Sequence, residues 1–474
     1  MKPIKRHRIF VEDRERRQFA ATNTLRITNL CCLLFLGIVT VATAPSGAQS
    51  LDDSRWLSLG VQGRFDDVAV MILSRSGDLY VGGNFARQMG VEADAIAEWT
   101  GSSWSALGSG LRGQFGDEGF FGPRVTGLAL DGGGSLYVGG DFGTAGGITA
   151  NGIVKWDGHA WSALAPGISE LGPLICDTNG ILFASGSVRT AYNVLTMGVA
   201  RQNGGSWSLL GAGMNSWVNA LALDRSGNLY AGGSFSIAGG VNANCVAKWN
   251  GQAWSPLGSG MDGYVRALAF DSNGDLYAGG AFTIAGGVSA TNVAKWNGST
   301  WSAVGAGLND YVTSLACDGF GNLFAGGGFT AAGQVTASHI AKWNGRAWFA
   351  LGSGTDRWVG TLIIEESGNL YVGGSFNKAG TNVSPGLARY LLREPAYNRL
   401  SLQSLGTGTN LITFLGTPGE NYALDMVNSL RPPLNWTPLR TNTAATADAV
   451  SAGYLILTNA IASPQAYYRL RHVP

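Results

Sequence analysis

The chain has 474 residues, of which 72 are glycine, and its charged residues divide into 32 basic and 31 acidic ones. Glycine is therefore about twice as frequent as usual, and the charged share of 13% is about half the usual one. The hydrophobic share of 45% is enough for a buried core and excludes general disorder. A net charge of +1 argues against a basic surface for nucleic acid, so nucleic acid is not an expected partner.

Residues 1–48 are predicted to be a signal peptide. Eight basic and three acidic residues lie in 1–29, followed by an uncharged apolar run at 30–44 and the small residues Ser46, Gly47 and Ala48. This order is typical of a secretory signal, with cleavage after Ala48. The apolar run is shorter than the roughly 20 residues of a membrane span, so a retained anchor is the weaker alternative. We expect an exported protein without a membrane span after cleavage, found outside the cell, on its surface or in the periplasm.

Histidine and cysteine, which many catalytic and metal sites use, are scarce in this chain. Outside the leader there are three widely separated histidines, His159, His339 and His472, and three cysteines, Cys176, Cys245 and Cys317. An odd number of distant cysteines indicates neither a disulfide framework nor a zinc site, and we expect them to be packed as small apolar side chains. The sequence therefore predicts no catalytic residues, no metal and no cofactor.

A repeat of about 47 residues determines the predicted fold. A Tyr-x-Gly-Gly box, or a variant of it, begins at Tyr80, Tyr137, Phe183, Tyr230, Tyr277, Phe324 and Tyr371. Each unit contains four strand-like runs. An Asp-x-x-Gly turn joins the first pair and an Asn-Gly turn joins the second. Four antiparallel strands per repeat predict a β-propeller, whereas the coils of a parallel β-helix would be shorter and would lack such hairpin turns.

Two series of tryptophans support this assignment and predict how the ring closes. One series contains Trp99, Trp156, Trp249, Trp296 and Trp343, and the other contains Trp56, Trp104, Trp161, Trp207, Trp254, Trp301 and Trp348. Trp56 precedes every other blade strand, while the last blade ends near Tyr390 without an outer strand of its own. We therefore expect residues 56–60 to complete the seventh blade, which would leave no free sheet edge in the ring. The predicted propeller covers residues 49–394.

The boxes LYAGGSFSIAGG at 229–240 and VAKWNGQAWSPLGSG at 246–260 carry a resemblance to a family. They resemble the secreted propeller repeats LYxGGxFTxAGG…VAxWxGxxWxxLG, found in the cortical cell-polarity marker family and in uncharacterised exported bacterial propellers. The resemblance implies a kelch-like propeller of the galactose oxidase-like superfamily, but no shared activity. The third blade departs furthest, with FASG in place of Tyr-x-Gly-Gly.

Residues 395–474 differ in composition and contain five short strand-like runs separated by Gly, Pro and Asn. They are predicted to form a small β-sandwich. The segment resembles C-terminal modules of secreted bacterial proteins through Tyr422, Leu424, Asn435, Trp436, Leu439, Tyr467, Tyr468, Arg469 and Leu470. A role of this module in presentation or sorting would be an analogy with those proteins.

Several motifs that suggest chemistry are better explained by the repeat. The Gly-x-Gly-x-x-Gly matches at 108–113 and 258–263 lack the strand–helix context of a nucleotide site. The acids Asp131, Asp177, Asp224, Asp271 and Asp318 occur once per blade, and we interpret them as turn residues rather than calcium ligands or paired catalytic acids. The recurring lysines Lys155, Lys248, Lys295 and Lys342 are expected to be solvated or snorkelling strand residues.

The face that carries the long connections is where a ligand would bind. One position opens the first strand of every blade at this face and is occupied by Asp67, Arg124, Glu170, Trp217, Tyr264, Tyr311 and Trp358. The four aromatic residues either cap the blade core or form an arc that stacks on sugar rings or on side chains of a partner.

The sequence thus predicts an all-β, exported, seven-bladed propeller that acts as a binding or scaffold module, and it favours a non-enzyme over an enzyme. Its partner would be a glycan or a surface protein, and the chain is expected to be a monomer. Two alternatives stay open. One is a polysaccharide-acting enzyme that uses Asp67 and Glu170, and the other is a purely structural surface protein.

Overall fold

The computed structural model describes residues 53–59, 67–85, 94–113, 115–116, 119–120, 123–150, 152–189, 194–203, 205–365 and 368–392, and strands of the terminal segments. The chain divides into two compact units, Leu51–Leu392 and Met1–Ser50 with Arg393–Pro474. Of the predicted signal peptide, only Ile9–Val11 belongs to the described residues, so the cleavage site lies outside them. Within the described residues, no helix is long and apolar enough to cross a membrane.

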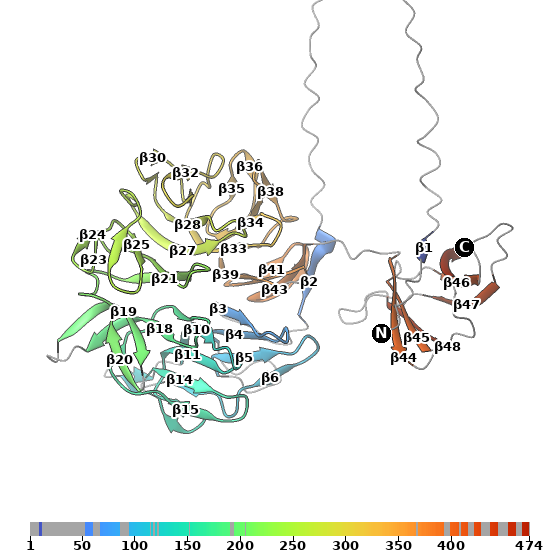
Figure 1. The fold of residues 1–474 in the computed structure, drawn as a ribbon, viewed down its shortest axis with the longest axis horizontal. Helices are drawn as coiled ribbons and strands as arrows, with labels where there is room; N and C mark the ends of the chain where they lie inside the picture. The colour runs from blue at the N-terminus through green and yellow to red at the C-terminus, as the bar shows by residue number, and fades with distance from the viewer. Residues whose placement is uncertain are drawn as a thin grey trace, which may run out of the picture. The chain divides into compact units, whose positions relative to one another are not determined.

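The first unit is a propeller of seven antiparallel sheets, the blades (Figure 1). Their first strands contact one another around the ring, and that of blade 7 returns to that of blade 1. Blade 1 consists of β3 (Asp67–Leu73), β4 (Leu79–Asn84), β5 (Ile96–Trp99) and β6 (Trp104–Ala106), and blade 2 consists of β10 (Arg124–Leu130), β11 (Leu136–Asp141), β14 (Ile153–Trp156) and β15 (Trp161–Ala163). Blade 3 consists of β17 (Leu174–Cys176), β18 (Leu182–Arg189), β19 (Leu195–Asn203) and β20 (Ser206–Leu209), and the short strand β16 (Ile168–Ser169) also pairs with β18.

Blades 4 to 7 repeat the same order. Blade 4 consists of β21 (Val218–Leu223), β22 (Leu229–Gly233), β25 (Val246–Trp249) and β26 (Trp254–Pro256), and blade 5 consists of β27 (Tyr264–Phe270), β28 (Leu276–Ala281), β31 (Val293–Trp296) and β32 (Trp301–Ala303). Blade 6 consists of β33 (Val312–Cys317), β34 (Leu323–Gly327), β37 (Ile340–Trp343) and β38 (Trp348–Ala350). Blade 7 consists of β39 (Val359–Ile364), β40 (Asn369–Gly374), β43 (Leu387–Leu391) and β2 (Trp56–Ser58). The predicted seven-bladed, all-β fold is therefore present.

Strand β2 closes the ring as the fourth strand of blade 7. It pairs antiparallel with β43, placing Trp56 opposite Tyr390, and the two rings meet edge to face with centroids 4.9 Å apart. The preceding short 3-10 helix, Asp53–Arg55, adds a polar contact, because the Asp53 carboxylate accepts hydrogen bonds from the backbone N–H and the hydroxyl of Ser353. The prediction that Trp56 begins the missing outer strand is confirmed.

The second tryptophan series fastens each blade to the one before it. Every member donates its indole N–H to a backbone carbonyl of the preceding blade, 2.8–3.3 Å away; the acceptors, in order from Trp56, are Leu351, Leu59, Leu107, Ala165, Leu210, Leu257 and Val304. These hydrogen bonds satisfy indole donors that are buried or half-buried. The series therefore has a structural role all around the ring.

Glycine in the Tyr-x-Gly-Gly box is required by two close approaches. In blade 5, a Cβ on Gly279 would lie 2.6 Å from Cγ1 of Val312 on the next blade, and a Cβ on Gly280 would overlap the carbonyl oxygen of Tyr264. The strand opposite is irregular between Val265 and Ala267. A glycine pair thus lets the first strand bulge and lets neighbouring blades pack closely.

The Ala-Gly-Gly box forms a second hairpin that was not predicted from the sequence. Gly239 and Gly240 have φ of +58° and +88°, and they join β23 (Ile237–Ala238) to β24 (Val241–Asn242). Two consecutive left-handed residues define a type I′ turn, in which glycine costs least. Asn215, from the connection that leads into blade 4, accepts backbone N–H bonds from Ser236 and Ile237 at 2.9 Å. The long connections are therefore braced against one another.

In its described residues, the C-terminal unit forms two sheets. One has the order β44 (Arg399–Gly406), β45 (Thr409–Leu415), β48 (Tyr454–Ala460); the other has the order β1 (Ile9–Val11), β49 (Tyr467–Val473), β46 (Asn421–Val427), β47 (Thr437–Thr443). β1, from the predicted leader, is parallel to β49. Of the residues that carry the resemblance, Asn435 and Trp436 lie outside the described residues. The all-strand content agrees with the expected class, and packing of the two sheets as a sandwich stays a prediction.

Candidate ligand-binding site at the channel mouth

The seven residues singled out in the sequence all lie where the first strand of a blade begins. Asp67, Arg124 and Tyr264 are the first residues of β3, β10 and β27. Trp217, Tyr311 and Trp358 directly precede β21, β33 and β39, and Glu170 lies between β16 and β17. The two short turns of each blade lie at its other end, because the four strands run antiparallel. The seven residues therefore share the face that carries the long connections.

Two of the four aromatic rings are exposed at this face. The exposed fraction is 47% for Trp217 and 54% for Tyr264, which stand on adjacent blades. Tyr311 and Trp358 are half-buried. The predicted arc is therefore divided into an exposed half and a packed half.

The packed half covers glycines of its own blades. A Cβ on Gly328 would lie 2.5 Å from Cζ of Tyr311, so the tyrosine ring rests on the backbone of that glycine. The Arg266 guanidinium lies over the same ring, 5.6 Å from its centroid. A Cβ on Gly360 would lie 3.2 Å from Cζ3 of Trp358. These contacts hold both rings in place and leave Trp217 and Tyr264 as the freely presented pair.

A cavity of about 730 Å³ opens along the channel of the propeller. Its lining residues are Ala69, Arg124, Ser216, Trp217, Asn219, Ser234, Tyr264, Arg266 and Thr313, from blades 1, 2, 4, 5 and 6. Three of them, Arg124, Trp217 and Tyr264, are among the residues singled out in the sequence. This volume lies within the usual range for small-molecule sites.

The wall residues Asn219, Arg266 and Thr313 were missed by the sequence analysis. They stand two positions after Trp217, Tyr264 and Tyr311, so the period of the repeat could have indicated them. The position lies within the irregular part of the first strand, and alternation along the strand places it on the same face as the mouth residue. Thr313 additionally donates to the carbonyl of Val359 on the next blade.

The two acids at the mouth do not line the cavity. Burial raises the pKa of Asp67 above its ordinary value, and this is partly opposed by a hydrogen bond from Ser375 and by the nearby charge of Arg124. Ser375 Oγ lies 3.2 Å from Asp67 Oδ1. The Glu170 carboxylate accepts a hydrogen bond from the Ser187 hydroxyl, and Glu170 adopts a left-handed φ of +50°. Each acid is thus bonded to a serine, and the pair is not assembled around the cavity.

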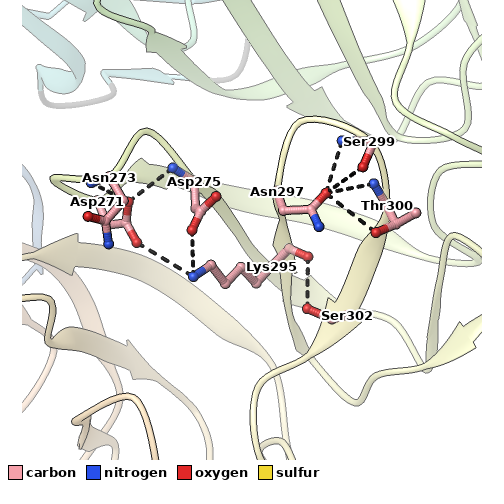
Figure 2. A network of polar contacts seen from close by, with 8 residues as sticks. All are labelled: Asp271, Asn273, Asp275, Lys295, Asn297, Ser299, Thr300 and Ser302. Atoms are coloured by element: carbon pink, nitrogen blue, oxygen red, sulfur yellow. Dashed lines mark hydrogen bonds and ion pairs between the residues drawn. The ribbon is translucent and has the colours of Figure 1, made fainter.

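The turn acids form structural networks at the opposite ends of the strands. In blade 5, Lys295 reaches both acids of the Asp271 turn, with Nζ 3.7 Å from Asp271 Oδ2 and 2.6 Å from Asp275 Oδ2 (Figure 2). Lys295 also lies over the Tyr277 ring. Lys155 and Lys248 repeat the pairing with Asp131 and Asp224. Lys155, Lys248 and Lys295 stay partly exposed, as solvated or snorkelling residues do, and each also bridges the turn acid and the box tyrosine of its blade. Lys342 lies over the ring of Phe324, the box residue of blade 6.

The three cysteines outside the leader, Cys176, Cys245 and Cys317, are free and half-buried. Burial, followed by nearby aspartates, raises the pKa of Cys176 and of Cys317 to about 12. Thiolates are therefore rare at neutral pH, in agreement with a packing role. Among the described residues, no three His, Cys, Asp or Glu side chains gather closely enough to hold a metal ion.

The seven sheets closed by β2 define the class: the chain is a β-propeller repeat protein. Residues 190–359 match the family described as the Rax2 C-terminal beta propeller domain, which is just over a third of the chain. No curated protein matches the chain significantly.

Several solved structures are similar to this chain, and one of them is described as a β-propeller. YCF48 bound to D1 peptide is 14% identical, with 73% of this chain and 98% of that chain covered and a TM-score of 0.47. The WD40 β-propeller domain of Doa1 is 14% identical, with 72% and 97% covered and a TM-score of 0.47. The extracellular domain of BT4673 from B. thetaiotaomicron is 12% identical, with 88% and 58% covered and a TM-score of 0.48. At these identities the similarity concerns the fold and not the ligand.

Proposed function

We propose that the protein is an exported propeller that acts as a binding module and takes its ligand at the channel mouth. The observation that carries this proposal is the cavity of about 730 Å³ beside the exposed rings of Trp217 and Tyr264. Large aromatic rings left exposed next to a concave polar surface are typical of recognition sites. The ligand class we favour is carbohydrate, because sugar rings present flat C–H faces to aromatic rings and hydroxyls to side chains such as Ser216 and Asn219.

A glycan array probed with the full chain would test this proposal. Stacking contributes roughly 0.5–1.5 kcal/mol per ring beyond area burial, so Trp217→Ala and Tyr264→Ala should each weaken binding several-fold. Phe320→Ala is a matched control, because Phe320 is an exposed ring (73%) in the β33–β34 turn at the opposite end of the blade. An array without any bound glycan, or equal binding by all three variants, would contradict the proposal.

Polysaccharide cleavage through Asp67 and Glu170 is less well supported, because neither acid lines the cavity. A reducing-end assay run on every glycan that binds would separate the two functions. Binding without product release would leave the binding module as the function, and release that is lost in Asp67→Asn and Glu170→Gln would favour the enzyme.

Export belongs to the same proposal, since the leader carries the features of a signal peptide. The exported protein should begin at Gln49 and carry no lipid. Cleavage there would also remove β1 from its pairing with β49. N-terminal sequencing of protein from the culture medium or the periplasm provides the measurement. Recovery of chains that start at Met1 in the membrane fraction would contradict export.

A further inference from the structure

The charge of the cavity wall distinguishes it from the rest of the molecule. Of the nine lining residues, two are arginines, Arg124 and Arg266, and none is acidic. The whole chain is nearly balanced between basic and acidic residues, with 32 against 31. The lining of the cavity is therefore positive in a protein without a strong net charge and would attract an anionic group, while the surrounding mouth also carries Asp67, close to Arg124, and Glu170.

Both arginines are exposed and can reach a ligand, although the Asp67 carboxyl lies near Arg124. Arg124 and Arg266 are exposed, and neither forms an ion pair with a carboxylate of the described residues. Arg266 instead lies over the Tyr311 ring, 5.6 Å from the centroid. A guanidinium stacked in this way is held in orientation while the N–H groups along its edge remain free to donate. Arg266 is thus already ordered for a planar, two-oxygen acceptor.

The exposed rings stand beside this positive wall. Tyr264 precedes Arg266 by two residues on β27, and Trp217 occupies the equivalent mouth position on the neighbouring blade. Ser216, Asn219 and Ser234 supply neutral donors and acceptors on the same side of the cavity. Apart from Ala69, no aliphatic side chain contributes to the wall. The site therefore suits a ligand with a flat ring, several hydroxyls and a carboxylate.

We propose that the channel mouth binds oligosaccharides that contain uronic acids. In this arrangement, a uronate carboxylate accepts hydrogen bonds from Arg266, a sugar ring stacks on Tyr264 or Trp217, and Arg124 holds an anionic group at the opposite wall. The inference rests on the proposed binding function and specifies its ligand. An acidic peptide fits less well, because the wall offers no apolar pocket for its side chains.

The test compares acidic oligosaccharides with uncharged analogues of the same shape. Trimers of galacturonate, glucuronate and guluronate, each beside its methyl ester, are titrated calorimetrically into the full chain at low and at physiological salt. At least one acid trimer should bind about tenfold or more tightly than its ester, since a hydrogen bond to a charged group contributes roughly 1.5–3 kcal/mol. Added salt should weaken binding of the acid but not of the ester.

Variants then assign the charge recognition to the wall. Arg266→Gln should reduce the preference for acid over ester by roughly tenfold, and Arg124→Gln should reduce it as well. Arg346→Gln, on the exposed turn between β37 and β38, is the matched control and should leave the preference unchanged. Unfolding of each variant in urea verifies that it is folded as the parent is.

The outcomes separate this inference from the proposed function. If esters or neutral glycans bind as well as the acids and Trp217→Ala weakens them, the binding function holds and the uronate inference is overturned. If an acidic peptide competes as strongly as the acid trimers, the inference is likewise overturned. If no oligosaccharide binds at all, both fail.

Discussion

In blade 3, the hydroxyl of Ser185 occupies the space that Gly172 leaves empty, since a Cβ on Gly172 would lie 2.6 Å from Ser185 Oγ. The hydroxyl donates to the carbonyl of Val218 on the next blade at 3.4 Å. Blade 2 has the reverse arrangement at the equivalent positions. Gly139 stands in the box where blade 3 has Ser185, and Thr126 stands on the first strand where blade 3 has Gly172. The Thr126 hydroxyl donates to the carbonyl of Leu171 on the next blade at 2.6 Å. Ser185 thus replaces a hydroxyl that blade 3 lacks on its first strand.

This exchange predicts a compensating double substitution. Gly172→Thr should lower the free energy of unfolding by roughly 1–3 kcal/mol, because its Cβ would meet Ser185 and the Val218 carbonyl. Adding Ser185→Gly should restore most of the loss, with a coupling energy above about 0.5 kcal/mol in a urea denaturation cycle. Gly132→Thr, at a turn where a Cβ meets nothing within 4 Å, is the control and should cost little. Additive losses in the double variant would contradict the exchange.

Closure of the ring should depend on Trp56. The side chain is 1% exposed, pairs with Tyr390 and donates to the Leu351 carbonyl at 3.0 Å. Removing such a buried ring usually costs about 3–5 kcal/mol, so Trp56→Ala should shift the urea midpoint clearly, and deletion of residues 51–60 should destabilise the whole ring. Trp161→Ala provides the comparison, because Trp161 has the equivalent role in blade 2 but is only partly buried. A deletion variant that unfolds at the parent's midpoint would disprove closure by β2.

Stability should fall in acid because of the turn acids. Partial burial acts to raise the pKa of Asp224, but hydrogen bonds from Asn228 and Ser226 and the charge of Lys248 bring the pKa below its ordinary value of 3.8. A pKa that is lower in the folded than in the unfolded chain adds stability above about pH 4, and this stability is lost as the pH falls through the folded pKa. Asp224→Asn should therefore cost roughly 0.5–1 kcal/mol at pH 6 and less at pH 2.5.

Asp67 provides the opposite case for the same measurement. Burial raises the pKa of Asp67, so its carboxyl favours folding most below about pH 4 and loses that contribution as the pH rises through its folded pKa. Asp67→Asn should therefore gain stability relative to the parent between pH 3 and pH 7, whereas Asp224→Asn should lose it. Urea unfolding of both variants across this range measures the two trends. Equal trends would contradict the assigned directions of the two pKa shifts.

The repeat predicted the blades and their closure because both depend on local patterns that recur seven times. Strand pairs, turn residues such as Asp271 and the position of Trp56 are each visible in the spacing of the boxes. The second hairpin at Gly239 and Gly240 was missed, because its two strands contain only two residues each. Strands this short have no alternation from which they could be recognised.

The candidate site was predicted only in part, because the packing of a side chain depends on its neighbours in space. Trp217 and Trp358 hold equivalent positions in the sequence, yet only Trp217 is exposed. The difference follows from the residue two positions further along the strand. After Trp358 this residue is Gly360, which leaves room for the ring, whereas after Trp217 it is Asn219, whose side chain fills that space. Arg266 was overlooked because the bulged position that it occupies holds a different residue type in nearly every blade.

The two halves of the aromatic arc should respond differently to truncation. Tyr311→Ala and Trp358→Ala should each lower the free energy of unfolding by roughly 1–3 kcal/mol, because both rings are packed on glycine backbone and Tyr311 also supports Arg266. Trp217→Ala and Tyr264→Ala should stay within about 0.5 kcal/mol of the parent, since substitutions at exposed positions usually do. Urea denaturation of the four variants provides the measurement. Large losses for Trp217→Ala or Tyr264→Ala would identify those rings as caps of the blade core and would remove them from the binding site.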